Sequence, residues 1–202
     1  MKTGVLILAT TLAMALAACS NDKAANGPAA GAKPAAEAAA SAVSADPEFE
    51  RLKAVKPVEA CAWLPLEKLA VVFPGLKFEL HQKLDAQLSG YAWDSRCTYW
   101  AGVGTVEYAK DVPTHTLHIF VNTPVSGEKA NANLASRAET ARSATGYQAQ
   151  AALGANAYSI VNTGVASLFF VKGQSEVQLG FSDLKTPNEE KIKKLIAIAQ
   201  SL

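Results

Sequence analysis

The stretch THTLHIFVN, residues 114–122, carries the clearest strand signal in the chain. Apolar and polar side chains alternate along it, which predicts a β-strand with one face against a core. The face expected to be buried carries His115, Leu117, Ile119 and Val121, and the opposite face carries Thr116, His118 and Phe120. The flanking sequence therefore has to supply partner strands and covering helices.

Further strands are predicted on both sides of this stretch. They are 76–80, 91–100, 105–108, 157–161, 165–171 and 176–181. The last three are separated only by Asn162-Thr163-Gly164 and Lys172-Gly173-Gln174. Glycine supplies the positive φ that tight turns need, so these three strands are expected to form an antiparallel meander.

Helices are predicted at 46–56, 65–73, 126–145 and 186–202. Asp46 and Pro47 are a typical N-cap and first helical residue, and Thr186-Pro187-Asn188-Glu189 has the pattern of a capping box. The expected buried stripe of the last helix is Ile192, Leu195, Ile196 and Ala199, and the residues expected in solvent are Lys191, Lys193 and Lys194. We expect a single α+β domain over 47–202, with a mostly antiparallel sheet of about five to six strands covered by helices.

The first nineteen residues have the pattern of a lipoprotein leader. Lys2 precedes an uncharged, mostly apolar run that ends in Leu16-Ala17-Ala18-Cys19, a lipobox. This predicts a signal peptide over 1–18 and a lipidated Cys19; the alternative is an ordinary signal peptide with a chance cysteine. Ser20 favours the outer membrane under the sorting rule of Gram-negative lipoproteins, so the expected location is the inner leaflet of the outer membrane, facing the periplasm.

Residues 19–46 are rich in alanine, interrupted by glycine and proline, and they lack leucine, isoleucine and aromatic residues. Such a segment buries too little apolar surface to offset its ordering entropy, so we expect a disordered tether. It is either a spacer that holds the domain away from the membrane or a linker with no required length.

Charge excludes several classes of partner. The chain has 19 Lys and Arg against 18 Asp and Glu, and Lys2 lies in the leader, so the mature chain is electrically balanced. A basic excess would indicate nucleic acid or an anionic membrane surface, and an acidic excess would indicate a cationic ligand. We therefore expect no nucleic-acid partner.

Two cysteines remain once Cys19 is assigned to lipid. Cys61 and Cys97 are expected to form a disulfide, because export places them in an oxidising compartment. A metal site or a redox pair is the alternative, but the chain lacks a nearby histidine partner and a Cys-x-x-Cys motif.

Four segments resemble a group of small bacterial lipoproteins of unknown function. They are Cys61-Ala62-Trp63-Leu64, Cys97-Thr98-Tyr99-Trp100, Leu153-Gly154-Ala155-Asn156-Ala157-Tyr158 and Leu168-Phe169-Phe170-Val171-Lys172-Gly173. The resemblance covers most of 58–202 and implies a PsbP-like α/β sandwich with a cysteine bridge. It implies no activity, because the group shares no catalytic residues, and this chain lacks the acidic residue expected at Ala155.

Catalytic and metal-binding patterns are weak. His115 and His118 differ in parity along their strand, so they cannot chelate one ion together. Asp94-Ser95-Arg96 holds a serine without a Gly-x-Ser-x-Gly motif, and Ser126-Gly127-Glu128-Lys129 lacks phosphate-loop spacing and fits a helix cap instead. We expect no catalytic residues, no metal ion and no cofactor, and we interpret the chain as a non-enzyme.

The main concentration of aromatic residues is Tyr91, Trp93, Tyr99 and Trp100, with Tyr108 further along. Tyrosine and tryptophan combine apolar area with a polar tip, which suits a recognition surface. The alternative is a packed sheet face, where aromatic residues are also common.

These observations favour a membrane-anchored periplasmic lipoprotein that binds a protein or envelope partner through the aromatic strand. One alternative is an immunity or inhibitor lipoprotein that neutralises a secreted toxin directed at the cell wall. The other is a binder of a small lipid or apolar ligand in a pocket between the sheet and the helices, which a cavity lined by Phe120, Phe169 and Phe170 would favour. The identity of the partner and the oligomeric state are left open.

Overall fold

The computed structural model describes residues 46–103 and 112–202, which belong to one compact unit. Its helices are α1 (Pro47–Lys53), α2 (Ala60–Trp63), α3 (Leu66–Val72), α4 (Gly127–Ala141) and α5 (Asn188–Ser201), with a 3-10 turn η1 (Ala151–Leu153). Its strands are β1 (Phe78–Ser89), β2 (Ala92–Val103), β3 (Pro113–Pro124), β4 (Gln148–Ala149), β5 (Tyr158–Asn162), β6 (Val165–Lys172) and β7 (Ser175–Asp183).

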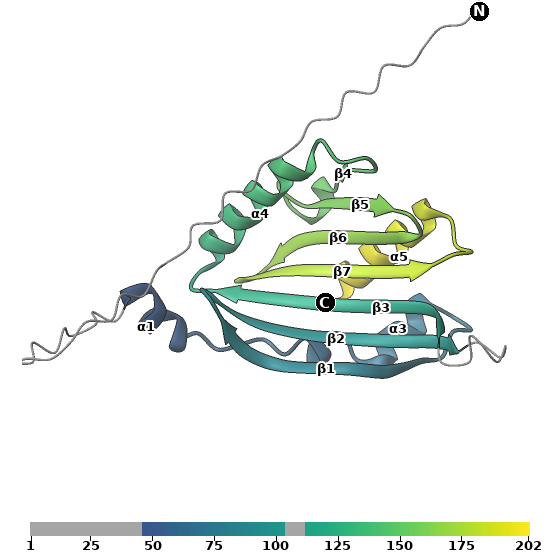
Figure 1. Ribbon diagram of the computed structural model, residues 1–202, viewed down its shortest axis with the longest axis horizontal. Coiled ribbons are helices and arrows are strands. Elements are labelled where there is room, and N and C mark those ends of the chain that lie inside the picture. Colours follow the sequence, from purple (N-terminus) through teal and green to yellow (C-terminus); the bar gives the residue numbers. More distant parts are fainter. Residues whose placement is uncertain (1–45, 104–111) are drawn as a thin grey trace, which may run out of the picture. The chain divides into compact units, whose positions relative to one another are not determined.

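All seven strands form one antiparallel sheet in the order β1-β2-β3-β7-β6-β5-β4 (Figure 1). The stretch 114–122 lies within β3, at the junction of the β1–β3 meander and the β5–β7 meander. The expected α+β class and the antiparallel pairing are confirmed. The predicted candidate strand 105–108 lies outside the described residues.

The expected number of about five to six strands is too low, because the described residues alone form seven. The additional strand, β4, is a two-residue segment paired with β5, too short to show a period in the sequence. The predicted strand 76–80 is also too short, because β1 continues to Ser89. Register shifts at Leu80/Gln82 and Leu84/Gln87 interrupt its alternation and hide the rest of the strand.

The two faces of the sheet are covered differently. The main core packs α2, α3 and α5 against one face, with Tyr99, Leu117, Ile119 and Phe181 at its centre. A smaller cluster packs α4 against the opposite face over β5 and β6. Figure 1 shows α3 and α5 behind the sheet.

Side-chain capping is confirmed at two of the three helix starts where the sequence predicts it. The Asp46 side chain accepts from the Glu48 N–H at 2.9 Å, and Ser126 accepts from the Lys129 N–H at 3.2 Å. The capping box at Thr186 is a wrong prediction, because its hydroxyl donates to Asp183 and Pro187 occupies the cap position of α5.

The prediction that Lys191 lies in solvent is also wrong, because the residue is buried, with 1% of its surface exposed. Its ammonium donates to the Gly164 carbonyl at 2.7 Å and to the Asp183 carbonyl. The buried face of α5 therefore includes Lys191, which lies on the same side of the helix as Leu195 and Ile198.

The expected disulfide is present and joins Cys61 in α2 to Cys97 in β2, with the two Cα atoms 5.1 Å apart. It ties the helical layer to a strand of the sheet. No helix within 46–103 and 112–202 combines the length and apolar character needed to cross a bilayer.

Candidate functional site

The sheet has one open region. Helix α4 packs on β6, β7 and β3, whereas α2 and α3 cover β1 and β2 from the other side. In the part of the chain that the structure describes, no helix covers the face of β1 and β2 that points away from these helices, or the adjoining parts of β3 and β7. Arg96, in the middle of β2, is exposed there.

Strand register places the open-face side chains in rows across the sheet. One row runs through Arg96, Phe120, Gln178 and Phe169, which oppose one another in turn on β2, β3, β7 and β6. The next row holds Thr98, His118, Gly180 and Ser167. Directly opposed side chains on adjacent strands are about 5 Å apart and contact one another.

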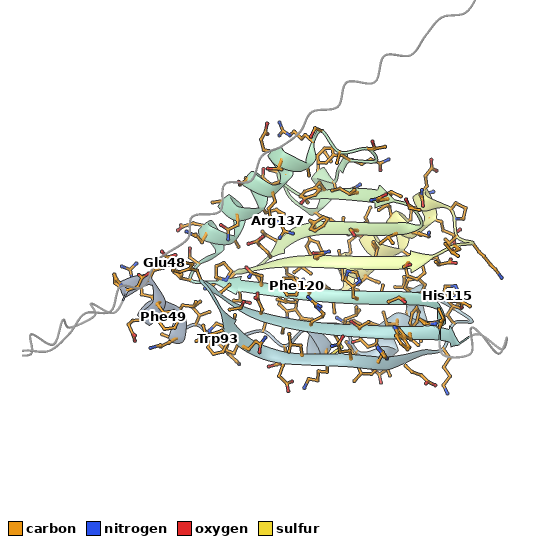
Figure 2. The ribbon with its side chains drawn as sticks, viewed as in Figure 1. Glu48, Phe49, Trp93, His115, Phe120 and Arg137 are labelled. Atoms are coloured by element: carbon orange, nitrogen blue, oxygen red, sulfur yellow. A yellow bond between two sulfur atoms is a disulfide. The ribbon has the colours of Figure 1, made fainter. Side chains whose placement is uncertain are left out.

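Two adjoining hollows open on this face and share Phe120. The first, of ≈ 330 Å³, is lined by Arg96, Thr98, His118, Phe120 and Gln178. The second, of ≈ 370 Å³, is lined by Phe120, Asn122, Asn133, Ser136, Arg137 and Glu176. We call the two together the Phe120 groove; Figure 2 shows Phe120 in the middle of the sheet, with Arg137 reaching toward it from α4.

Gly180 determines the shape of the groove floor. A Cβ atom at this position would overlap the His118 ring, so the absent side chain lets the imidazole lie against the β7 backbone. Burial lowers the pKa of His118 below its usual value, and the nearby positive charge of Arg96 lowers it further. The imidazole is therefore neutral at pH 7 and forms a polar, uncharged floor.

Replacing Gly180 by alanine is expected to displace His118 toward solvent. The pKa of His118 should then rise toward its ordinary value, because the imidazolium regains hydration. Stability should change little, since the ring can rotate away while the backbone stays in place. Histidine-selective NMR titration measures the pKa, and an unchanged value in Gly180→Ala would show that the ring does not depend on this gap.

Charges in the groove are distributed unevenly. Glu176 is 5% exposed, and its carboxylate accepts from Asn133 Nδ2 at 3.0 Å and pairs with Arg137 at 3.3 Å. The Arg96 guanidinium lies over the Phe120 ring, 5.5 Å from its centroid, and has no carboxylate within 4.0 Å among the described residues. Glu176 is thus neutralised within the fold, and the Asp94 carboxylate on the same face accepts from Asn122 Nδ2 at 2.7 Å. Arg96 is left facing the groove without an ion pair among the described residues.

The aromatic residues predicted as a recognition surface do not share one face. Tyr91 is exposed in the β1–β2 turn, whereas Trp93 donates from Nε1 to the Leu52 carbonyl at 3.0 Å and lies beside α1 (Figure 2). Trp100 lies on the open face and stacks on His81.

The prediction that Tyr99 belongs to a recognition surface is wrong, because only 2% of its surface is exposed. Its hydroxyl donates to the Leu64 carbonyl, and burial raises the pKa of the phenol to about 12. Strand alternation is the physical reason: Trp93 and Tyr99 share the helix-covered face with Cys97, whereas Arg96, Thr98 and Trp100 share the open face. That parity was present in the sequence and would have identified the groove side of β2.

Phe120, Phe169 and Phe170, whose common cavity would favour an apolar ligand, lie in different surroundings. Phe170 lies in the main core, Phe169 is covered by α4, and Phe120 faces the groove. Alternation again separates them, because the consecutive residues Phe169 and Phe170 point to opposite faces.

The weaker catalytic candidates take structural positions. Ser95 is fully buried, and its hydroxyl accepts from the Ala60 N–H at 3.1 Å and donates to the Val58 carbonyl at 2.7 Å. His115 and His118 lie on opposite faces as expected, with His115 packed against Phe181 and 3.7 Å from Asp183. Within the described part of the chain, no three metal-ligating side chains come together.

Comparison with known proteins gives one structural likeness. No family model and no curated protein matches the chain. The fold resembles the crystal structure of the extracellular domain of PknH from Mycobacterium tuberculosis, with a TM-score of 0.53 and 11% identity over 72% of this chain and 96% of that one. At this identity the likeness shows a shared fold.

Proposed function

We propose that the chain is a lipid-anchored, non-enzymatic binding module of the cell envelope, which holds a protein or an envelope component in the Phe120 groove. The observation that carries this proposal is the uncovered sheet face, hollowed at Phe120 and flanked by α4. Each hollow is within the size range of ligand sites, about 300 to 1,000 Å³.

The lining supports binding rather than chemistry. The groove combines an apolar ring with amides, hydroxyls and guanidinium groups, a mixture typical of recognition sites. His118, the histidine of the groove, lies beside Arg96 and Gly180. Among the described residues, no serine or threonine hydroxyl and no cysteine thiol is hydrogen-bonded to its ring.

The anchor is tested by Cys19→Ser. We expect this variant to lose membrane retention, because the thiol that would carry the acyl chains is gone. Fractionation of cells followed by mass spectrometry of the mature N-terminus measures this, and Ser20→Ala serves as a matched control that should stay in the membrane. If Cys19→Ser stayed in the membrane at the level of the control, lipid anchoring through Cys19 would be contradicted.

The groove is tested by photo-crosslinking in cells of the host. A photoreactive amino acid at Thr98, on the groove wall, should capture a partner, whereas the same amino acid at the exposed Lys193 on α5 should not. Mass spectrometry of the adduct identifies the captured component; a wall-directed toxin there would specify the inhibitor alternative. Equal capture at both positions, or none at Thr98, would contradict a binding role for this face.

A further inference from the structure

We infer that the Phe120 groove binds a saccharide that carries an anionic group, and that Arg96 binds the anion. This inference rests on the proposed function and names the chemical class of its ligand. It is carried by the exposed cation on the groove wall and by the neutral polar side chains that line the groove with it.

The two arginines that line the groove differ in their partners. Arg137 is committed to Glu176 at 3.3 Å and also lies over the Phe169 ring. Arg96 is packed against Phe120 but pairs with no carboxylate among the described residues. A guanidinium that lies over an aromatic ring and makes no side-chain hydrogen bond within the described residues is well suited to bind carboxylate or phosphate oxygens.

The neutral side chains of the groove offer hydrogen-bonding groups to a ligand. Thr98, Gln178 and Ser136 line the groove, and none of their side chains makes a hydrogen bond within the described residues. Hydroxyl and amide groups in this arrangement both donate and accept, which matches the hydroxyls and acetamides of sugars. Phe120, half-buried between them, offers the C–H face of a sugar ring an apolar contact.

His118 supplies an internal reporter of the anion. The charged side chain that faces it is Arg96 on β2; Gly180 on β7 carries no charge, and the Arg137–Glu176 pair lies in the adjoining hollow. An anion bound to Arg96 offsets the positive charge that disfavours the imidazolium. Binding should therefore raise the pKa of His118.

The experiment uses the full mature chain purified in detergent and three sugars that differ in one group. They are N-acetylglucosamine, which is neutral; N-acetylmuramic acid, which carries a carboxylate; and N-acetylglucosamine phosphate. The chain has 3 histidines, so histidine-selective NMR resolves each ring, and His118→Gln assigns the signal. We expect at least one anionic sugar to raise the pKa of His118, and the neutral sugar to leave it unchanged.

Variants of Arg96 complete the test. Arg96→Gln should weaken binding of the anionic sugar about tenfold, whereas Arg96→Lys keeps the charge and should restore part of it. Arg142→Gln, on an exposed arginine at the end of α4, is the matched control and should bind like the wild type.

A response to the carboxylate sugar alone or to the phosphate sugar alone identifies the anion. The inference is overturned if the neutral sugar binds equally well, if no sugar perturbs His118, or if Arg96→Gln binds like the control. In those cases, an adduct captured from Thr98 would still support the binding module with another class of ligand.

Discussion

The double variant Cys61→Ala/Cys97→Ala is expected to unfold about 10 °C below the oxidised wild type, because the bridge contributes about 4 kcal/mol to stability. The disulfide closes a loop with a sequence separation of 36 and restricts the unfolded chain accordingly. Cys97 is fully buried in β2, so the bridge also fixes α2 against the sheet.

Thermal unfolding followed by circular dichroism measures this shift. The comparison is made in the Cys19→Ser background, so that lipid and a third thiol do not contribute. Wild type in reductant is the matched control and should approach the melting temperature of the double variant. A double variant that melts with the oxidised wild type would show that the bridge does not stabilise the fold.

Lys191→Met is expected to lower the free energy of unfolding by about 3 kcal/mol. Methionine keeps much of the side-chain volume but cannot donate, so the carbonyls of Gly164 and Asp183 lose their hydrogen bonds from the buried ammonium. These carbonyls belong to the β5–β6 turn and to the end of β7, so the lysine links both to α5.

Lys193→Met provides the control on the same helix. Lys193 is exposed, and its substitution should change stability by less than about 0.5 kcal/mol. Urea unfolding of the two variants separates a buried structural role from a general effect of charge on α5. Equal effects at the two positions would contradict the assignment of Lys191 as a buried link.

Local patterns predicted most of the elements. The proline and aspartate at the start of α1, the serine cap of α4 and the glycine turns of the β5–β7 meander all act within a few residues, so they are visible in the sequence. The second half of β1 was missed because its bulges break the alternation. Lys191 was misplaced because the buried stripe of α5 includes a charged residue.

The candidate site was harder to predict for a physical reason. The predicted recognition surface consists of four neighbours along the chain, Tyr91, Trp93, Tyr99 and Trp100. Strand alternation distributes them over different faces. The groove instead assembles residues by register, as in the row through Arg96, Phe120 and Gln178. Register depends on the pairing of distant strands, which the sequence pattern does not specify.

The central claim is that the open sheet face is occupied in the cell envelope. Hydroxyl-radical footprinting tests it most directly, by comparing oxidation of Phe120 in purified protein and in intact envelopes. Leu184, 92% exposed, is the internal control, and Tyr91 reports on the turn outside the groove. The account predicts that Phe120 is protected in envelopes while Leu184 reacts equally in both samples. Equal oxidation of Phe120 in the two samples, or protection confined to Tyr91, would contradict it.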